Sequence, residues 1–224
     1  MKTVLCYGDS NTWGYNPRGG RYDHTIRWPA VMASLLNGRD GAGLSAGMPG
    51  AGGAAYWVVE EGLNGRTTCR EDPFEDRNGL RQILPILRSH KPLDLVIVML
   101  GTNDLKRRFN PGPHEIAEGA RLVAEAALAS GTGLEGGAPR VLMVCPSPAS
   151  GAPAFRQIMD ENALEISRGL ASCYKSCAGG CGAAFFDAGS VVGVSSPVDG
   201  VHWEAEDHRR FAAAMAEQVR TLLG

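Results

Sequence analysis

The sequence of 224 residues contains no apolar run that approaches the roughly 18 residues of a membrane-spanning helix. It also lacks an excess of charge, because its formal net charge is only -2, and so gives no reason to expect nucleic acid or an anionic membrane as a partner. Met1 and Lys2 lead straight into an apolar segment, without the charged, apolar and cleavage regions of a signal peptide. We therefore expect a cytoplasmic protein that binds neither membrane nor nucleic acid.

The cysteines do not form a disulfide or metal pattern. Cys6 and Cys145 lie in apolar segments and are expected to be small core residues. Cys173, Cys177 and Cys181 recur at every fourth position, which raises a metal site as an alternative. Zinc ligands more usually form closer cysteine pairs with a second, distant pair or with histidines. We expect reduced thiols at a late helix end and in the loop after it, with no metal and no cofactor.

Apolar segments alternate with helical patterns along the whole chain. A hydrophobic content of 44% and a charged content of 21% are those of a soluble globular protein, and the length suits one domain over residues 1–224. Expected strands cover residues 3–7, 56–61, 93–100, 140–145 and 183–187, and helical periodicity is clearest over 113–130 and 204–223. This alternation predicts an α/β fold, a three-layer α/β/α sandwich around a mostly parallel five-stranded sheet.

Residues 37–55 interrupt this pattern. They are rich in Gly and Ala, carry almost no charge after Asp40 and show no periodicity, so we expect an inserted surface loop. The loop contains Ser45 in a G-x-S-x-G match at 43–47. A nucleophile elbow of this kind requires a strand before it and a helix after it, and neither is present here. We therefore expect Ser45 to have no catalytic role.

A Gly-Asp-Ser run at 8–10 ends the first expected strand. A serine at this point lies at the carboxyl edge of a parallel sheet, where open α/β folds bind their ligands. Ser10 is thus a candidate nucleophile, although a serine hydroxyl needs a base and a group that orients the base. Asp199 and His202 offer both, since a neutral imidazole with an ordinary pKa of about 6.5 can accept the serine proton. The carboxylate three residues earlier can hold the other ring nitrogen.

Donors for an oxyanion are also present at the expected strand ends. Asn103 lies just after the third expected strand, and its side-chain amide can point at the developing negative charge. The backbone N–H groups of Gly65 and Ser10 can complete the oxyanion hole. Nucleophile, base, orienting acid and oxyanion donors together are the requirements of acyl transfer from an ester.

Four segments resemble, in order, the four sequence blocks of the SGNH (GDSL-type) hydrolases. They are Gly-Asp-Ser-Asn-Thr-Trp-Gly at 8–14, the block around Gly65, Gly-Thr-Asn-Asp at 101–104 and Asp-Gly-Val-His at 199–202. The runs at 60–68 and 186–191 are most similar to the bacterial arylesterase/acyltransferase branch. Because the blocks run from residue 8 to residue 202, the resemblance covers most of the chain.

The resemblance implies a flavodoxin-like SGNH hydrolase fold and a serine esterase. Such an enzyme cleaves short-chain or aryl carboxylic esters through an acyl-enzyme, and some members pass the acyl group to an alcohol instead of water. By position, the resemblance also implies that an acyl or alcohol pocket is lined by Asn11, Tyr15, Lys106 and Val201. Because relatives often assemble, it further implies a homo-oligomer whose only other partners are the small-molecule ester and the acyl acceptor.

Three alternatives remain open at this point. The same triad serves a carbohydrate O-acetyl esterase or a thioesterase. A flavodoxin-like module that only binds an anion at the carboxyl edge of its sheet would need no reactive serine. A metal-assisted hydrolase would use Asp9 and Asp104, to which we assign scaffolding hydrogen bonds instead. The remaining histidines have no partner pattern and are expected to face solvent: His24, His90, His114 and His208.

Overall fold

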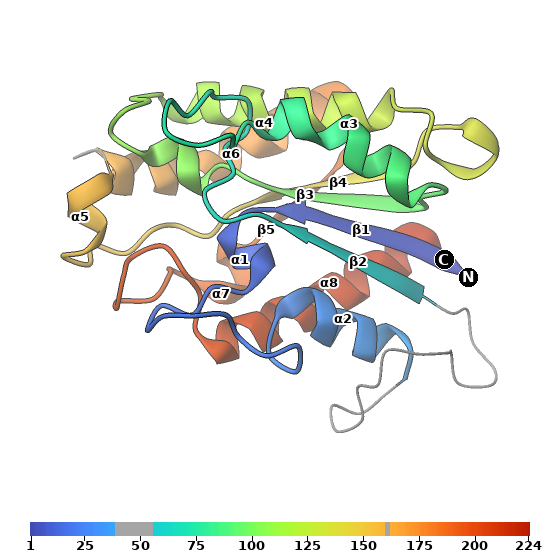
Figure 1. Cartoon of the computed structure of the whole chain (residues 1–224), viewed down its shortest axis with the longest axis horizontal. Coiled ribbons are helices and arrows are strands. Elements are labelled where there is room, and N and C mark those ends of the chain that lie inside the picture. The colour runs from blue at the N-terminus through green and yellow to red at the C-terminus, as the bar shows by residue number, and fades with distance from the viewer. Residues whose placement is uncertain (39–55, 160–161) are drawn as a thin grey trace.

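The computed structural model describes residues 1–38, 56–159 and 162–224. Its centre is a parallel five-stranded sheet in the order β2-β1-β3-β4-β5 (Figure 1). The strands are β1 (Lys2–Gly8), β2 (Tyr56–Gly62), β3 (Leu95–Met99), β4 (Arg140–Cys145) and β5 (Ala184–Asp187). The chain leaves β1 on one side for β2 and returns on the other side for β3. In open α/β sheets, such a change of direction marks the point at the carboxyl ends of the strands where ligands bind.

Helices cover both faces of the sheet, which confirms the predicted three-layer sandwich (Figure 1). One layer holds α3 (Gly79–His90), α4 (Pro113–Leu128) and α6 (Ala163–Cys181), and the other holds α2 (Trp28–Leu36), α7 (Gly189–Val192) and α8 (Ala205–Leu223). Shorter helical turns are α1 (Ser10–Trp13), α5 (Phe155–Ile158), η1 (Thr102–Leu105) and η2 (Leu134–Gly136). None of the described helices is long and apolar enough to cross a bilayer.

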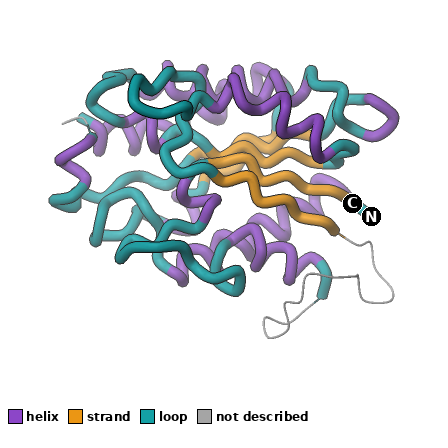
Figure 2. The backbone as a smooth tube through the Cα atoms, viewed as in Figure 1, coloured by secondary structure: helices purple, strands orange, loops and turns teal. Residues whose placement is uncertain are grey.

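Successive side chains of the strands point to opposite faces of the sheet and pack into two separate hydrophobic cores. In β1, Leu5 and Tyr7 face the layer of α3, α4 and α6, whereas Val4 and Cys6 face the layer of α2 and α8. All five residues of β3 are buried, as expected for a strand covered on both faces. Loops gather beyond the carboxyl ends of the strands, opposite the chain termini (Figure 2). The sheet therefore acts as a rigid base that presents this group of loops.

The expected strands agree with the observed ones to within two residues at each end. The two helices with predicted bounds correspond to α4 and α8, whereas no bounds were predicted for α2, α3 and α6. Cys173, Cys177 and Cys181 lie toward the end of α6, and Cys181 is its last residue, so the expected helix end is confirmed; none of the three lies in the loop after it, and that part of the expectation was wrong. Residues 39–55, which include Ser45 and nearly all of the expected inserted loop, lie outside the described residues.

Candidate active site

Ser10 is presented at the junction between β1 and α1. β1 ends at Gly8, Asp9 caps the helix by accepting a hydrogen bond from the backbone N–H of Asn11 (3.0 Å), and Ser10 is the first helical residue. The turn lies tightly against the end of β2. A Cβ atom at Gly62 would lie 2.1 Å from the Trp13 nitrogen, so only glycine allows this approach.

His202 and Asp199 lie in the segment between α7 and α8. One oxygen of Asp199 accepts backbone N–H bonds from Val201 (3.1 Å) and His202 (3.0 Å), which fixes the turn. The other oxygen lies 2.6 Å from His202 Nδ1, and His202 Nε2 lies 2.9 Å from Ser10 Oγ. With the Nδ1 proton held by the carboxylate, Nε2 is left as the acceptor for the serine hydroxyl. The three side chains form a continuous hydrogen-bonded chain.

The local environment keeps the Asp199 carboxylate ionised. Burial works to raise the pKa of this carboxyl, but hydrogen bonds from the ring and backbone of His202 and from Val201 outweigh it. The pKa of Asp199 is therefore lowered from its ordinary value. An ionised partner at Nδ1 stabilises the imidazolium that forms when His202 accepts a proton.

The side chain of Asn11 connects the serine turn to the histidine segment. Its Nδ2 donates to the carbonyl of Val201 (3.0 Å), and its Oδ1 accepts from the backbone N–H of Trp203 (3.1 Å). Both bonds are buried and bracket His202. Asn11 thus connects two segments that are about 190 residues apart in the sequence, and it fixes their relative position so that Ser10 lies beside His202.

The two other expected oxyanion donors also lie close together. Asn103 is part of η1, just after β3, and its Nδ2 donates to the carbonyl of Arg66 (3.2 Å). This bond places the amide beside Gly65, the preceding residue, whose φ of +82° favours glycine. An amide nitrogen carries two protons, so the bond to Arg66 leaves one for a substrate oxygen.

Arg66 lies close to these groups, although the sequence pattern does not mark it as a functional residue. Its guanidinium is buried, donates to the carbonyls of Gly8 (2.8 Å) and Glu61 (2.5 Å), and lies 4.1 Å from the centre of the Tyr7 ring. The Arg66 side chain therefore connects the ends of β1 and β2, while its backbone carbonyl accepts the hydrogen bond from the Asn103 side chain. Its position directly after Gly65 could have drawn attention to Arg66. No neighbouring residue in the sequence, however, indicated that this charged side chain would be buried.

Two carboxyl groups behind the site have scaffolding contacts, as expected. Burial raises the pKa of Asp9 to about 6, against the lowering effect of its bond from Asn11. Burial likewise raises the pKa of Asp104 to about 6, although Asp104 accepts bonds from the backbone N–H (3.0 Å) and the hydroxyl (2.5 Å) of Thr68. The bonds to Thr68 connect η1 to the segment after Arg66.

The residues expected to line a pocket have different surroundings. The half-buried Tyr15 ring lies over the ring of His202, with centroids 4.3 Å apart. Val201 is buried and engages Asn11 through its carbonyl. Lys106 follows η1, is 8% exposed and lies 3.8 Å from a carboxylate oxygen of Asp72. Tyr15 therefore lies beside His202, whereas Lys106 is paired with an acid.

One expectation about the other histidines was wrong. His24 and His114 are exposed, and His90 is partly buried beside Glu61, with 2.9 Å between Nε2 and the carboxylate. His208 is fully buried instead, edge-on to the rings of Tyr22 and Trp203. Neither of its ring nitrogens finds a hydrogen-bond partner among the described residues.

Comparison with known families agrees with this geometry. Residues 6–210 match the model of the GDSL-like lipase/acylhydrolase family, a span that contains Ser10, Asn103 and His202. The chain belongs to this family. As a GDSL-like acylhydrolase, it is a carboxylic ester hydrolase. No curated protein matches the sequence significantly.

Solved structures resemble this GDSL-like acylhydrolase over its whole length. Est24, a carbohydrate acetylesterase from Sinorhizobium meliloti, is 36% identical, with a TM-score of 0.87 over 99% of this chain and 100% of that one. The native aryl esterase of M. smegmatis is 38% identical, with a TM-score of 0.85 over 99% of this chain and 100% of that one. The expected resemblance to SGNH hydrolases is thereby confirmed.

Proposed function

We propose that this GDSL-like acylhydrolase cleaves short-chain or aryl carboxylic esters through a covalent acyl-enzyme on Ser10. The observation that carries the proposal is the hydrogen-bonded chain from Ser10 through His202 to Asp199, with contacts of 2.9 and 2.6 Å. Nucleophile and base at this spacing, with the base oriented by a third group, are the requirements for activating a serine hydroxyl.

In the first half of the proposed reaction, Ser10 Oγ attacks the ester carbonyl carbon while its proton moves to His202 Nε2. The C–O double bond opens, and the electron pair goes to the carbonyl oxygen. The tetrahedral intermediate then collapses, and the C–O bond to the alcohol or phenol breaks. The leaving oxygen takes the proton from His202, which leaves an acyl ester on Ser10.

The second half repeats these steps with a new nucleophile. Water loses a proton to His202 and attacks the acyl carbon; the Ser10 oxygen leaves and regains the proton as the carboxylic acid departs. An alcohol in place of water would give a new ester, and we propose this acyl transfer as a side reaction. The scheme requires neither a metal nor a cofactor, so a chelator is expected to leave turnover unchanged.

We assign the stabilisation of the tetrahedral oxyanion to three donors. These are the backbone N–H groups of Ser10 and Gly65 and the side-chain amide of Asn103. The bond from Asn103 to the Arg66 carbonyl supports this assignment because it holds the amide in place before substrate arrives. Donors oriented in advance act on the transition state without reorganisation.

Acetylated carbohydrates are a second candidate substrate class. This candidate rests on the 36% identity and full-length match to Est24. Aryl esters and sugar acetates differ in the leaving group, which is an aromatic phenol in one and a hydrated polyol in the other. The ratio of kcat/KM for an aryl acetate and an acetylated sugar distinguishes them, because specificity is the difference in transition-state binding.

The test is a substrate panel applied to the wild type, Ser10→Ala and Ser45→Ala. The panel holds aryl esters of increasing acyl length, an acetylated sugar and an acyl thioester. We expect fastest turnover of short aryl esters, no turnover by a folded Ser10→Ala variant, and an unchanged Ser45→Ala variant. Wild-type turnover by Ser10→Ala would overturn the assignment of the nucleophile. A strong preference for the acetylated sugar would favour the second candidate.

We further propose that the protein acts in the cytoplasm as a homo-oligomer. The six free thiols support a reducing compartment, because disulfides form mainly in oxidising ones. The assembly is suggested by the resemblance to oligomeric relatives. Light scattering of the purified protein tests it: a mass at a multiple of the chain mass supports an oligomer, and a mass equal to that of one chain rejects it.

A further inference from the structure

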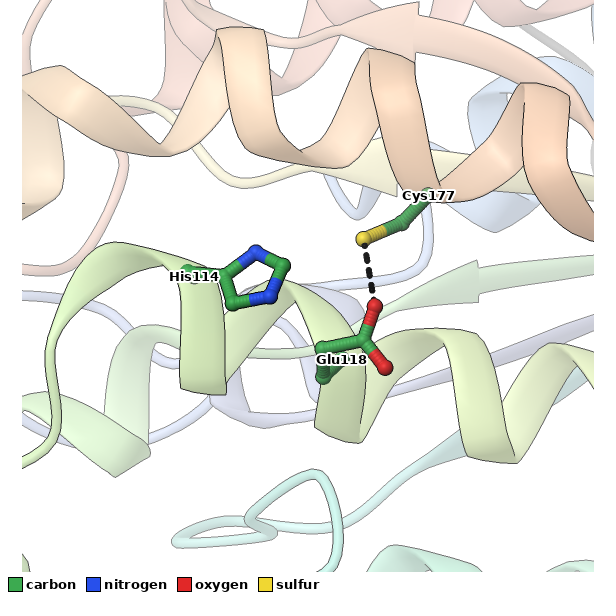
Figure 3. Close-up of side chains that lie close together, drawn as sticks. All are labelled: His114, Glu118 and Cys177. Carbon is green, nitrogen blue, oxygen red and sulfur yellow. Dashed lines mark hydrogen bonds between the residues drawn. The ribbon is translucent and has the colours of Figure 1, made fainter.

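Away from the carboxyl edge of the sheet, α4 and α6 bring three side chains with metal-binding atoms together. His114 and Glu118 lie one turn apart on α4, and Cys177 faces them from α6 (Figure 3). A ring nitrogen, a carboxylate oxygen and the sulfur all lie within 4.8 Å of one another. Within the described residues, no other three such side chains form a group of this kind.

The existing contacts already orient two of the three groups. The Cys177 thiol donates to Glu118 Oε1 (3.2 Å), as the dashed line in Figure 3 marks. The other oxygen of Glu118 accepts from Arg121 Nη2 (2.7 Å) and Nε (3.0 Å). Arg121 thereby fixes the carboxylate and turns Oε1 toward the sulfur. Groups that orient a ligand from behind in this way strengthen metal sites.

We propose that His114, Glu118 and Cys177 form a binding site for a divalent transition-metal ion, with Zn²⁺ as the preferred ion. Imidazole nitrogen and thiolate sulfur select zinc over magnesium and calcium, which prefer oxygen alone. The side chains come from two helices of one rigid layer, so their relative positions are set by the fold. Cys177 is buried, whereas His114 is exposed, which gives the ion a path from solvent.

Binding replaces a proton by the ion. The Cys177 S–H bond breaks, the sulfur binds the metal as a thiolate, and the proton passes to solvent. The thiolate and the Glu118 carboxylate then balance the two positive charges of Zn²⁺, while neutral His114 adds no charge. Three protein ligands leave a fourth position, and water from the exposed side completes a tetrahedron.

The distances between the three ligand atoms require only a small movement of the side chains to bind zinc. Bond lengths to zinc of about 2.0–2.3 Å place ligand atoms roughly 3.3–3.6 Å apart in a tetrahedron. The 3.2 Å between sulfur and Glu118 Oε1 lies just below this range. The remaining separations, within 4.8 Å, close by rotation of the exposed His114 imidazole.

Bound metal would stabilise the helices that pack against the segment from Leu100 to Asn103, which carries a proposed oxyanion donor. One turn before Cys177, the Tyr174 hydroxyl donates to the carbonyl of Leu100 (2.7 Å), the residue before Gly101. On α4, Ile116 lies against the same glycine. A metal that joins α4 to α6 therefore stabilises both helices. Through Ile116 and Tyr174, these helices contact Leu100 and Gly101, which lead into Asn103. The expected consequence is a higher Tm in the presence of Zn²⁺.

The test is a titration of the reduced, chelator-treated protein with Zn²⁺ in competition with a chromophoric chelator. We expect one ion per chain and a rise in Tm. Cys177→Ser and His114→Ala each remove one ligand and should weaken the Kd by at least about tenfold. Cys173→Ser is the matched control, because Cys173 lies on the same helix outside the cluster, and should leave the Kd unchanged.

Co²⁺ provides a readout specific to sulfur. A thiolate-to-cobalt charge-transfer band is expected in the wild type and in Cys173→Ser, and is expected to be absent from Cys177→Ser. The proposal is overturned if the wild type binds no stoichiometric Zn²⁺. It is equally overturned if binding survives both Cys177→Ser and His114→Ala. Because His114 is exposed, His114→Ala keeps the test valid even if the cysteine variant fails to fold.

Discussion

The aromatic ring of Tyr15 lies over the imidazole of His202, with centroids 4.3 Å apart and planes inclined by 30°. This contact places the electron-rich face of an aromatic ring against the group proposed to become positively charged during catalysis. A cation above such a face is attracted by about 0.5–2 kcal/mol. Tyr15 is thus in a position to orient His202 and to stabilise its protonated form.

Replacing Tyr15 tests this relationship. Tyr15→Leu removes the ring and should lower kcat about two- to thirtyfold, which is the stated energy converted to rate. Tyr15→Phe retains the ring and should keep nearly all activity. Steady-state kinetics with an aryl ester provide the measurement. If Tyr15 only lines a substrate pocket, as the family resemblance implies, Tyr15→Leu would raise KM and leave kcat unchanged.

Asn103 is expected to act in the transition state rather than in binding. Asn103→Ala removes the proposed oxyanion donor and should lower kcat by about 10²–10³ with little change in KM. Asn103→Asp is a matched variant of nearly the same size that replaces the donor by a carboxylate, and it should be no better than alanine. An Asn103→Ala enzyme with wild-type kcat would remove this residue from the oxyanion hole.

The bonds of Asn11 predict a joint loss of stability and activity. Asn11→Ala leaves the Val201 carbonyl and the Trp203 N–H without their buried partner, at about 1–3 kcal/mol for each unpaired group. The free energy of unfolding and kcat should therefore fall together, which urea denaturation and kinetics measure in parallel. A variant that changes only the preferred acyl length at full stability would show that Asn11 lines the pocket instead.

His208 should make the protein sensitive to acid. Burial lowers its pKa from 6.5 to about 3, so the native protein keeps the ring neutral while the unfolded chain accepts a proton. The stabilisation is therefore complete above pH 6.5 and is lost progressively as pH falls toward 3. Between pH 7 and pH 5 the loss from this residue is about 2 kcal/mol.

The matched variant is His208→Phe, which suits the aromatic surroundings of Tyr22 and Trp203 and cannot take up a proton. Its free energy of unfolding should drop less between pH 7 and pH 5 than that of the wild type. Equal pH dependence in the two proteins would mean that His208 is protonated in the native state as well.

Much of the architecture could be predicted because its causes are local. Apolar runs bounded by glycine identify the strands, and a run as continuous as β3 implies cover on both faces. The Asp199–His202 pair could be proposed because three residues of one turn bring carboxylate and ring together. Ser10 and Asn103 could be linked to that pair because parallel strands end at one edge of the sheet.

The roles of Asn11 and Arg66 depend on contacts with residues far away in the sequence, which no local sequence pattern indicates. The partners of Asn11 lie about 190 residues away, and those of the buried Arg66 include Gly8, 58 residues away. The bounds of α3 and α6 could not be predicted, because an internal Pro85 in one and glycines and cysteines in the other weaken the helical signal. Packing against the sheet overrides these weak propensities.

The proposed mechanism depends on Ser10 as a nucleophile that His202 activates. Labelling with a serine-directed fluorophosphonate, followed by peptide mass spectrometry, tests it most directly. We expect one adduct, on Ser10, that forms rapidly in the wild type and far more slowly in a folded His202→Ala variant. An adduct on another serine, no adduct on the folded wild type, or equally fast labelling of Ser10 without His202 would contradict it.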